Sequence, residues 1–178
     1  GQAAVGDRLM LTPQGIEVRV RAIHAQNKDS KFGLAGERCA LNIAGADLTK
    51  ELVSRGNWIV GEAAHTPSDR FDARVRVLSS EDRPLRHWTP VHLHLGAEDV
   101  SARVATLEDR TIPVGETGLA QIVLDKPIGA LQGDRFILRD QSARRTLGGG
   151  VVIDPFSPAR GRAKSERLSI VRGLEQTD

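Results

Sequence analysis

The sequence predicts an all-β chain of two small antiparallel barrels that ends in the start of a helix. First, apolar and polar residues alternate with a period of two along most of the chain, as they do in half-buried strands. Second, turn-forming pairs such as Gln14-Gly15 separate the alternating segments. Third, one turn-and-strand motif occurs in both halves. Many short strands spaced in this way are typical of barrels and sandwiches, not of alternating β and α units.

The expected strands follow one another from the first residues onward. The clearest is residues 17–23, where Val18, Val20 and Ala22 share one face and arginines share the other. The further candidate strands are residues 8–12, 38–43, 71–77, 91–95, 100–104, 118–124, 135–139 and 150–154. Because successive side chains of a strand point to opposite faces, we expect every second residue of these segments to be buried.

A repeated motif indicates two similar halves. Residues 6–11 (GDRLML) return as residues 133–138 (GDRFIL), each a Gly-Asp turn that leads into a strand. The boundary is expected within residues 61–69, which show little hydrophobic pattern. We therefore predict a first barrel over residues 1–64, without its N-terminal strands, and a second barrel over residues 65–156.

The end of the chain departs from this pattern. Residues 157–178 contain a basic linker and then a helix that Ser165 is expected to cap, with Leu168, Val171 and Leu174 on one side. The sequence stops soon after this helix, so we expect the helix to begin a further domain and to have nothing here to pack against.

Composition and charge narrow the class of protein. Hydrophobic residues make up 39% and charged residues 27%, and there is neither an apolar run of membrane length nor a signal peptide. The single cysteine, Cys39, excludes an intrachain disulfide and suits the reducing cytoplasm. Net charge is only +2, yet the segment from Arg139 to Arg172 holds eight basic and three acidic residues. Such a basic end is either a footprint for a phosphate backbone or a solvated tail without a partner.

The pattern closest to an enzyme site is His92-Leu93-His94 followed by Glu98. Two histidines at i and i+2 share a strand face, and a nearby carboxylate can complete a metal site, as in the cupin motif. The flanking glycines of that motif and a later histidine are absent, which favours a polar outer strand face. We find no nucleophile with an adjacent base, and residues 148–150 (GGG) enter a strand, which indicates a close approach of backbones. A metal-binding β-barrel enzyme using His92 and His94 remains the alternative from a different class.

Aromatic residues limit the kind of RNA contact that the chain can make. Aromatic residues are 3% of the chain, with no tyrosine, and all six Phe and Trp residues could lie in the core. Recognition of single-stranded RNA relies on aromatic stacking, so we expect recognition of the shape and phosphates of an RNA helix. The arginines available for this, or for simple solvation of a strand face, are Arg103, Arg139, Arg144 and Arg145.

A series of short motifs runs along the chain in a fixed order. These are residues 5–7 (VGD), 35–38 (AGER), 54–59 (SRGNWI), 85–87 (LRH), 90–92 (PVH), 115–116 (GE), 133–140 (GDRFILRD) and 146–155 (TLGGGVVIDP). In this order they resemble the second and third domains of translational GTPases of the elongation factor Tu type. Residues 40–43 (ALNI), the GGGxxxDP ending and the basic linker into a helix favour the bacterial selenocysteine-specific elongation factors (SelB).

The resemblance implies a function for the chain. It would be the tRNA-binding portion of a GTP-dependent, cytoplasmic elongation factor that delivers selenocysteyl-tRNA to the ribosome at recoded UGA codons. The segment itself would be no enzyme and hold no cofactor, because GTP and magnesium belong to a GTPase domain absent from this sequence. Its partners would be selenocysteyl-tRNA, the ribosome, its own GTPase and winged-helix domains and, through the latter, an mRNA hairpin, with no membrane. The alternative in the same class is the equivalent barrels of another translational GTPase, initiation factor 2 type included.

The resemblance also implies a tRNA site on the second barrel. In the elongation factor Tu family the third domain grips the backbone of the tRNA T-stem, where arginines clamp phosphates and short polar side chains reach 2′-hydroxyls. The expected tRNA-binding residues here are Arg139, Asp140, Gln141, Ser142, Arg144, Arg145, His92, Ser101 and Arg103. Arg55 is the candidate for the aminoacyl pocket on the first barrel. Because opening strands of that barrel would be missing, residues 8–12 or 17–23 are expected to leave unpaired backbone edges.

Overall fold

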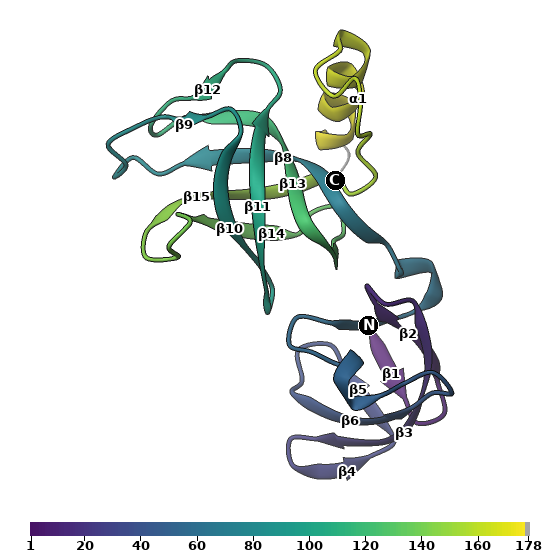
Figure 1. The fold of residues 1–178 in the computed structure, drawn as a ribbon. Helices are drawn as coiled ribbons and strands as arrows, with labels where there is room; N and C mark the ends of the chain where they lie inside the picture. Colours follow the sequence, from purple (N-terminus) through teal and green to yellow (C-terminus); the bar gives the residue numbers. More distant parts are fainter. Residues whose placement is uncertain (177–178) are drawn as a thin grey trace. The chain divides into compact units, whose positions relative to one another are not determined.

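The structure is a computed structural model that describes residues 1–176, so the last two residues of the expected C-terminal segment lie outside it. The chain forms two compact units, Gly1–His65 and the residues from Thr66 onward. The described residues contain fifteen strands, two short 3-10 helices and one α-helix (Figure 1). The prediction of a β chain with a C-terminal helix is therefore confirmed. No helix within residues 1–176 is long and apolar enough to cross a membrane.

The first unit consists of two antiparallel sheets. The smaller sheet pairs β1 (Gln2–Ala4) with β5 (Phe32–Leu34). The strands of the larger sheet are β2 (Arg8–Thr12), β3 (Ile16–Ala25), β4 (Lys28–Ser30), β6 (Cys39–Ala44) and β7 (Trp58–Val60). They run in the order β4-β3-β2-β7, with β6 also paired to β3. Among the described residues these pairings leave both sheets open, so the barrel expected here is not closed.

The core of this unit follows the predicted alternation, with one irregularity. Val18 and Val20 are 1% exposed, as the pattern in β3 predicts. Ala22 was expected to join them, but the pairing of β3 with β6 shifts by a residue between Val20 and Ala22. Such a bulge turns the following side chains over, so Ile23 is buried instead, at 1% exposure.

The expectation of unpaired edges on residues 8–12 or 17–23 is wrong. β2 pairs with β3 on one side and with β7 on the other. β3 pairs with β2 and β4 along one side and with β6 along the other. The later strands β4, β6 and β7 therefore pair with the edges that the sequence appeared to leave open. The 3-10 helices Lys50–Leu52 and Glu62–Ala64 lie before and after β7 in the chain.

The second unit contains a closed six-stranded antiparallel barrel. Its strands are β8 (Pro67–Val77), β10 (Thr89–Leu95), β11 (Glu98–Thr106), β13 (Thr117–Gly129), β14 (Arg135–Arg139) and β15 (Thr146–Asp154). They close in the order β10-β11-β13-β8-β15-β14. Two short strands, β9 (Leu85–Arg86) and β12 (Thr111–Ile112), form a separate pair.

The predicted alternation in β8 is confirmed by burial. Phe71, Ala73, Val75 and Val77 are at most 1% exposed and fill the barrel. Phe71 also meets Phe136 of β14 edge to face, with ring centroids 5.4 Å apart. The intervening residues of β8 point outward, where their environment differs along the strand.

The three glycines at the start of β15 permit the close approach predicted from the sequence. A Cβ atom on Gly149 would lie 2.6 Å from the carbonyl oxygen of Phe136 on β14. Cβ atoms on Gly148 and Gly150 would collide with backbone carbonyls of β8 on the other side. Side chains at these positions would therefore force β15 away from both neighbours in the barrel wall.

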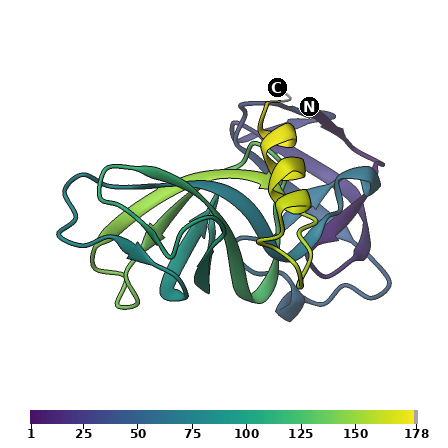
Figure 2. The same cartoon turned by 90° about the horizontal axis from the view of Figure 1, so that it is seen from above.

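The C-terminal helix α1 (Ser165–Glu175) is present as predicted, but its cap and its surroundings differ from expectation. The N-cap residue is Lys164 and makes no side-chain cap bond, so Ser165 does not cap the helix. Val171 is fully buried, and the apolar side chains that surround it are Leu107, Leu119, Ile153, Leu168 and Leu174. The helix thus packs on the outside of the barrel (Figures 1 and 2). The expectation that it has nothing to pack against is wrong.

Candidate nucleic-acid interface

Three of the expected tRNA-binding residues form a row on the outside of the barrel. His92 of β10 lies directly opposite Arg139 of β14 and Ser101 of β11. Directly opposed residues of antiparallel strands project to the same side of the sheet. Arg103 lies two residues beyond Ser101 on β11 and therefore shares this side. His92 and Arg139 are 47 positions apart in the sequence, and the pairing of β10 with β14, which closes the barrel, brings them together.

The turn after β14 carries the rest of the expected site, and Asp140 organises it. One carboxylate oxygen, Oδ1, accepts the backbone N–H groups of Arg144 and Arg145 at 2.8 and 3.0 Å. The other, Oδ2, accepts the hydroxyl of Ser142 at 2.8 Å. The N–H of Arg145 and then the Ser142 hydroxyl hold the pKa of the Asp140 carboxyl below its usual value. The Asp140 carboxylate therefore holds residues 140–145 in a hydrogen-bonded turn.

The arginines of this region differ in their surroundings. Arg144 is exposed and its guanidinium forms no ion pair within residues 1–176. Arg139 is half-buried, and its Nε has no hydrogen-bond partner in the described part of the chain. Arg145 lies 3.5 Å from the carboxylate of Glu81, whose side chain is only 7% exposed. The guanidinium groups of Arg139 and Arg144 are therefore the ones that could bind a phosphate without first breaking an ion pair within the described residues.

The histidines do not assemble a metal site. His92 Nδ1 lies 3.1 Å from Asp99 Oδ1, while the carboxylate of Glu98 is buried and contacts Lys126 Nζ at 2.7 Å. His94 is half-buried, and its Nε2 has no partner among the described residues. Across residues 1–176 no group of three His, Cys, Asp or Glu side chains is placed to hold a metal ion. The geometry therefore offers no support for the metal-enzyme alternative.

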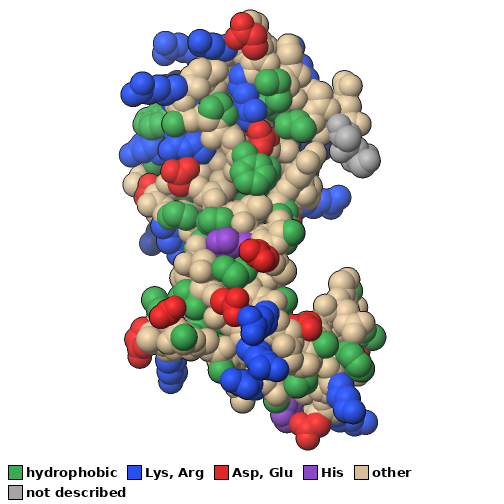
Figure 3. All heavy atoms as spheres, turned by 90° about the vertical axis from the view of Figure 1, so that its right-hand side faces the viewer, with side chains coloured by type: hydrophobic (Ala, Val, Ile, Leu, Met, Phe, Trp, Pro, Cys, Tyr) green, Lys and Arg blue, Asp and Glu red, His purple; other side chains and the backbone are tan. Residues whose placement is uncertain are grey.

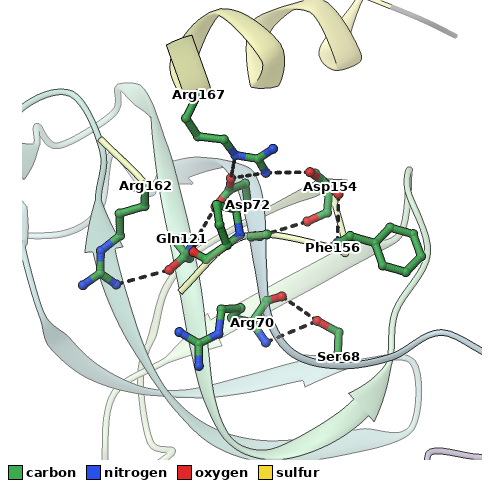
Figure 4. Close-up of polar contacts among 10 residues, drawn as sticks. Ser68, Arg70, Asp72, Gln121, Asp154, Phe156, Arg162 and Arg167 are labelled. Carbon is green, nitrogen blue, oxygen red and sulfur yellow. Dashed lines mark hydrogen bonds and ion pairs between the residues drawn. The ribbon is translucent and has the colours of Figure 1, made fainter. Parts of the chain in front are cut away.

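Part of the basic segment between Arg139 and Arg172 is neutralised inside the molecule. Arg167 of α1 reaches Oδ2 of Asp72 at 2.6 Å and Oδ2 of Asp154 at 2.5 Å (Figure 4). Burial alone would lower the pKa of Arg167, but the hydrogen bonds that it donates to Asp154 and Asp72 outweigh this and raise the pKa. Arg172, which is more exposed, pairs with Glu108 alone. Figure 3 shows a face on which basic (blue) and acidic (red) side chains are interspersed. The segment as a whole is therefore not one phosphate footprint.

The linker before α1 is also tied to the barrel. Gln121 is fully buried, and its Nε2 donates to Oδ1 of Asp72 at 3.0 Å and to the carbonyl of Pro158 at 3.1 Å. Its Oε1 accepts a hydrogen bond from Nη1 of Arg162 at 3.2 Å (Figure 4). A row of three polar side chains on adjacent strands, Gln121, Asp72 and Asp154, thus lies beneath the linker and the helix.

The helix and the expected tRNA site occupy opposite halves of the barrel. The linker and α1 contact Leu119 of β13, Asp72 of β8 and Ile153 of β15. The row described above lies on β11, β10 and β14, which are the other three strands of the closed order. The helix therefore leaves the candidate face uncovered.

Arg55 lies on the first unit, at the tip of the loop before β7. The loop is ordered by Asn57, whose Oδ1 accepts the backbone N–H of Ser54 at 2.7 Å and the side-chain amide of Gln14 at 3.1 Å. Arg55 is exposed and forms no ion pair with any described residue. It is thus presented to solvent on an ordered turn of the first unit.

Sequence reasoning missed one exposed aromatic residue beside this face. Trp88 is 41% exposed, whereas the sequence had allowed a place in the core for all six aromatic residues. Phe32 and Phe156 are also exposed, at 49% and 72%. The signal was present, because Trp88 precedes the alternating pattern of β10 and is not part of it.

Comparison with known proteins agrees with the fold. Residues 72–159 match the family model of the selenocysteine-specific elongation factor, beta-barrel domain. Among solved structures, a crystal structure of sup35 complexed with GDP superimposes with a TM-score of 0.75 at 17% identity, over 88% of this chain and 42% of that one. The apo form of translation elongation factor SelB from Methanococcus maripaludis gives a TM-score of 0.72 at 21% identity, over 89% and 38%. At these identities the two structures support the fold alone.

Sequence relatives give the family. The chain is 42% identical over 174 residues to the selenocysteine-specific elongation factor of Escherichia coli (strain K12), in an alignment that covers 98% of this chain and 26% of that protein. The corresponding factor of Haemophilus influenzae is 33% identical, again over 98% of this chain and 27% of that protein. The chain thus spans about a quarter of the length of these relatives. The chain therefore consists of β-barrel domains of the SelB-like elongation factor type.

Proposed function

We propose that this chain is the tRNA-binding portion of a GTP-dependent, cytoplasmic elongation factor that delivers selenocysteyl-tRNA to the ribosome at recoded UGA codons. The observation that carries the proposal is the row of Arg139, His92 and Ser101 on the half of the barrel that α1 leaves open. GTP and magnesium would bind a GTPase domain of the whole protein. Its other partners would be the ribosome and, through winged-helix domains, an mRNA hairpin.

The domain assignment is part of the same proposal. Residues 1–64 would correspond to the second domain and residues 65–156 to the third domain of an elongation factor of the Tu type. Residues 157–178 would lead toward a winged-helix region. The membership of the chain in the SelB-like family supports this order, and so does the closed barrel that begins at Pro67.

The geometry of the turn suggests how RNA would be held. The unpaired guanidinium groups of Arg139 and Arg144 would bind phosphates, because each carries several N–H donors in a planar fork. Gln141 and Ser142 are exposed and would reach 2′-hydroxyls. A carboxylate has about four acceptor positions, and Asp140 uses three within its turn, which leaves one for a 2′-hydroxyl.

Arg145, Arg103 and Arg55 would have smaller or separate roles. Arg145 is already paired with Glu81, so a phosphate would have to compete with a carboxylate for it. Arg103 would contact the RNA backbone at the end of the row. On the first unit, the exposed guanidinium of Arg55 would contact the aminoacyl group, a role that its presentation on an ordered turn supports.

Salt dependence of tRNA binding tests the proposal. Binding of a transcript of the selenocysteine-specific tRNA would be measured by filter retention over a range of salt concentrations. Arg139→Gln and Arg144→Gln should each lower the slope of log affinity against log salt by about one unit, since each phosphate contact releases about one counterion. Arg172→Gln is the matched control, because it removes the same charge from a residue paired with Glu108.

The outcomes separate the proposal from simple solvation. Loss of slope in the two variants, with an unchanged slope in Arg172→Gln, supports the site. If all three variants lose the same slope, binding is a property of net charge alone. If none loses any, the tRNA does not reach this half of the barrel.

A further inference from the structure

Trp88 adopts a backbone conformation that is unusual for a bulky residue. It lies between β9 and β10 with φ of +69°, in the left-handed region that large side chains rarely enter. Its N–H donates to the carbonyl of Val104 at 2.7 Å, and the N–H of His87 donates to that of Arg110 at 2.8 Å. These bonds hold the strained residue in place, and 41% of its surface is exposed.

Two arginines lie over this ring. The guanidinium carbon of Arg162 is 5.4 Å from the ring centroid and that of Arg103 is 6.0 Å from it. The ring of His87 is stacked beside it, with centroids 6.0 Å apart. Neither arginine has a carboxylate partner within the described residues, since Arg162 donates only to the neutral amide of Gln121. This contrasts with Arg167, five residues further along the chain, which bridges two carboxylates.

The position of Trp88 relates it to the candidate face. Arg103 is on β11, two residues from Ser101, at the end of the row described above. Arg162 comes from the linker, where Arg160 and Lys164 are also exposed. Trp88 therefore stands where the open half of the barrel meets the basic linker. Hydrogen bonds of Gln121 with Pro158 and Arg162 hold this linker against the barrel, and Figure 4 shows the bond from Arg162.

We propose that Trp88, Arg103 and Arg162 form a binding site for an unpaired nucleotide of RNA. The base would stack on the indole, and the two arginines would turn from the ring to the phosphates on either side. Stacking on an exposed aromatic ring is the usual way in which proteins hold unpaired bases, and arginine binds both π-faces and phosphates. The proposal rests on the proposed function, because RNA must first reach this half of the barrel.

The strain at Trp88 favours a binding role over a purely structural one. A glycine would adopt this φ without cost, and an exposed ring contributes little to the core. Strained residues persist where the surrounding structure enforces them, and they gather at binding sites. The competing explanation is that the ring serves only to hold Arg162 and the linker in place.

Fluorescence of Trp88 gives a direct readout. The chain has two tryptophans, so Trp58→Phe leaves Trp88 as the sole tryptophan and defines the background for all measurements. A short single-stranded oligoadenylate should quench its emission in a saturable manner. A blunt RNA duplex of equal length should bind the candidate face without quenching.

Substitutions then test the role of each group by fluorescence anisotropy of labelled RNA. Trp88→Gly, which removes the ring and relieves the φ, should weaken binding of the oligoadenylate about ten-fold and leave duplex binding unchanged. Trp88→Phe should retain part of the affinity. Arg103→Gln and Arg162→Gln should each reduce the salt slope for the oligoadenylate. Gln26→Gly, at a residue with φ of +51° in the first unit, controls for the relief of strain and should change neither affinity.

Each result supports or overturns the site. Unchanged oligoadenylate affinity in Trp88→Gly, or saturable binding without quenching, means that the ring only holds the linker, and the proposal is wrong. Failure of the duplex to bind while the oligoadenylate quenches Trp88 would refute the proposed tRNA face and retain the nucleotide site.

Discussion

Arg167→Met should release the C-terminal helix from the barrel, because it removes the only cation that the described residues place between Asp72 and Asp154. Asp72 is completely buried and Asp154 is 11% exposed at the side chain, while the Arg167 side chain is 13% exposed. The two carboxylates lie on neighbouring strands in register with one another. Without Arg167 both would be buried close together with like charge.

The size of the effect follows from this burial. Removal of one partner from a buried ion pair costs about 3–5 kcal/mol. Asp72 keeps its hydrogen bond from Gln121, and Asp154 keeps that from the N–H of Phe156, so the lower end of the range, about 3 kcal/mol, is expected. The loss cannot exceed the free energy that docks α1, because an undocked helix would expose both carboxylates to water.

Two measurements follow the release. Urea unfolding gives the change in global stability, and hydrogen exchange of the amides around Val171 reports whether the helix stays docked. Arg172→Met is the matched control, since Arg172 is paired with Glu108 but its side chain is 56% exposed, and its loss should cost less than about 1 kcal/mol. Asp72→Asn in the Arg167→Met background should recover part of the loss, because it removes one of the two uncompensated charges. The reasoning would be refuted if Arg167→Met and Arg172→Met lost the same stability while the amides of α1 remained equally protected.

Two further predictions concern the backbone of the barrel and the turn of the candidate site. Gly149→Ala should destabilise the chain by about 2–3 kcal/mol in urea unfolding, because the new Cβ would lie 2.6 Å from the Phe136 carbonyl oxygen. The control, Gly173→Ala in the helix, should raise the stability by up to about 1 kcal/mol, because alanine favours the helix and its Cβ would meet no described atom beyond the backbone of its own helix within 4 Å. The turn held by Asp140 should stay ordered at neutral pH. Because the pKa of that carboxyl is lowered in the folded chain, its contribution is present above the ordinary value and is lost as pH falls through the lowered one. Amide NMR shifts of Arg144 and Arg145 should therefore titrate below about pH 4, and Asp140→Ala should abolish that titration; a titration near neutrality would contradict the assignment.

The strands could be predicted from the sequence because their signal is local. Phe71, Ala73, Val75 and Val77 alternate with polar residues, and all four are buried in β8. The bulge in β3 could not be predicted in this way, because the shift that exchanges Ala22 for Ile23 depends on how β6 pairs with it. The protected edges of β2 and β3 likewise depend on strands that come later in the chain.

The candidate site was only partly accessible to sequence reasoning. The resemblance pointed to Arg139 and His92, and the strand register places them opposite one another. The resemblance did not reveal that Arg167 would form an ion pair with Asp72, which is 95 residues away in the sequence. A run of basic residues carries no information about which of its members will meet a carboxylate after folding.

The arginines on the outside of the barrel fall into two groups, those that contact a carboxylate and those that do not. On the half covered by α1, Arg167, Arg172 and Arg74 each contact a carboxylate, and these pairs join the helix to the wall. On the open half, Arg145 contacts Glu81, whereas Arg139 and Arg144 have no such partner within residues 1–176. A phosphate that approaches a paired arginine must compete with the carboxylate already bound, and a phosphate that approaches an unpaired one need not. Net charge alone would not distinguish the two halves, so we expect the pairing of the arginines, more than their number, to direct any RNA that binds to the uncovered half.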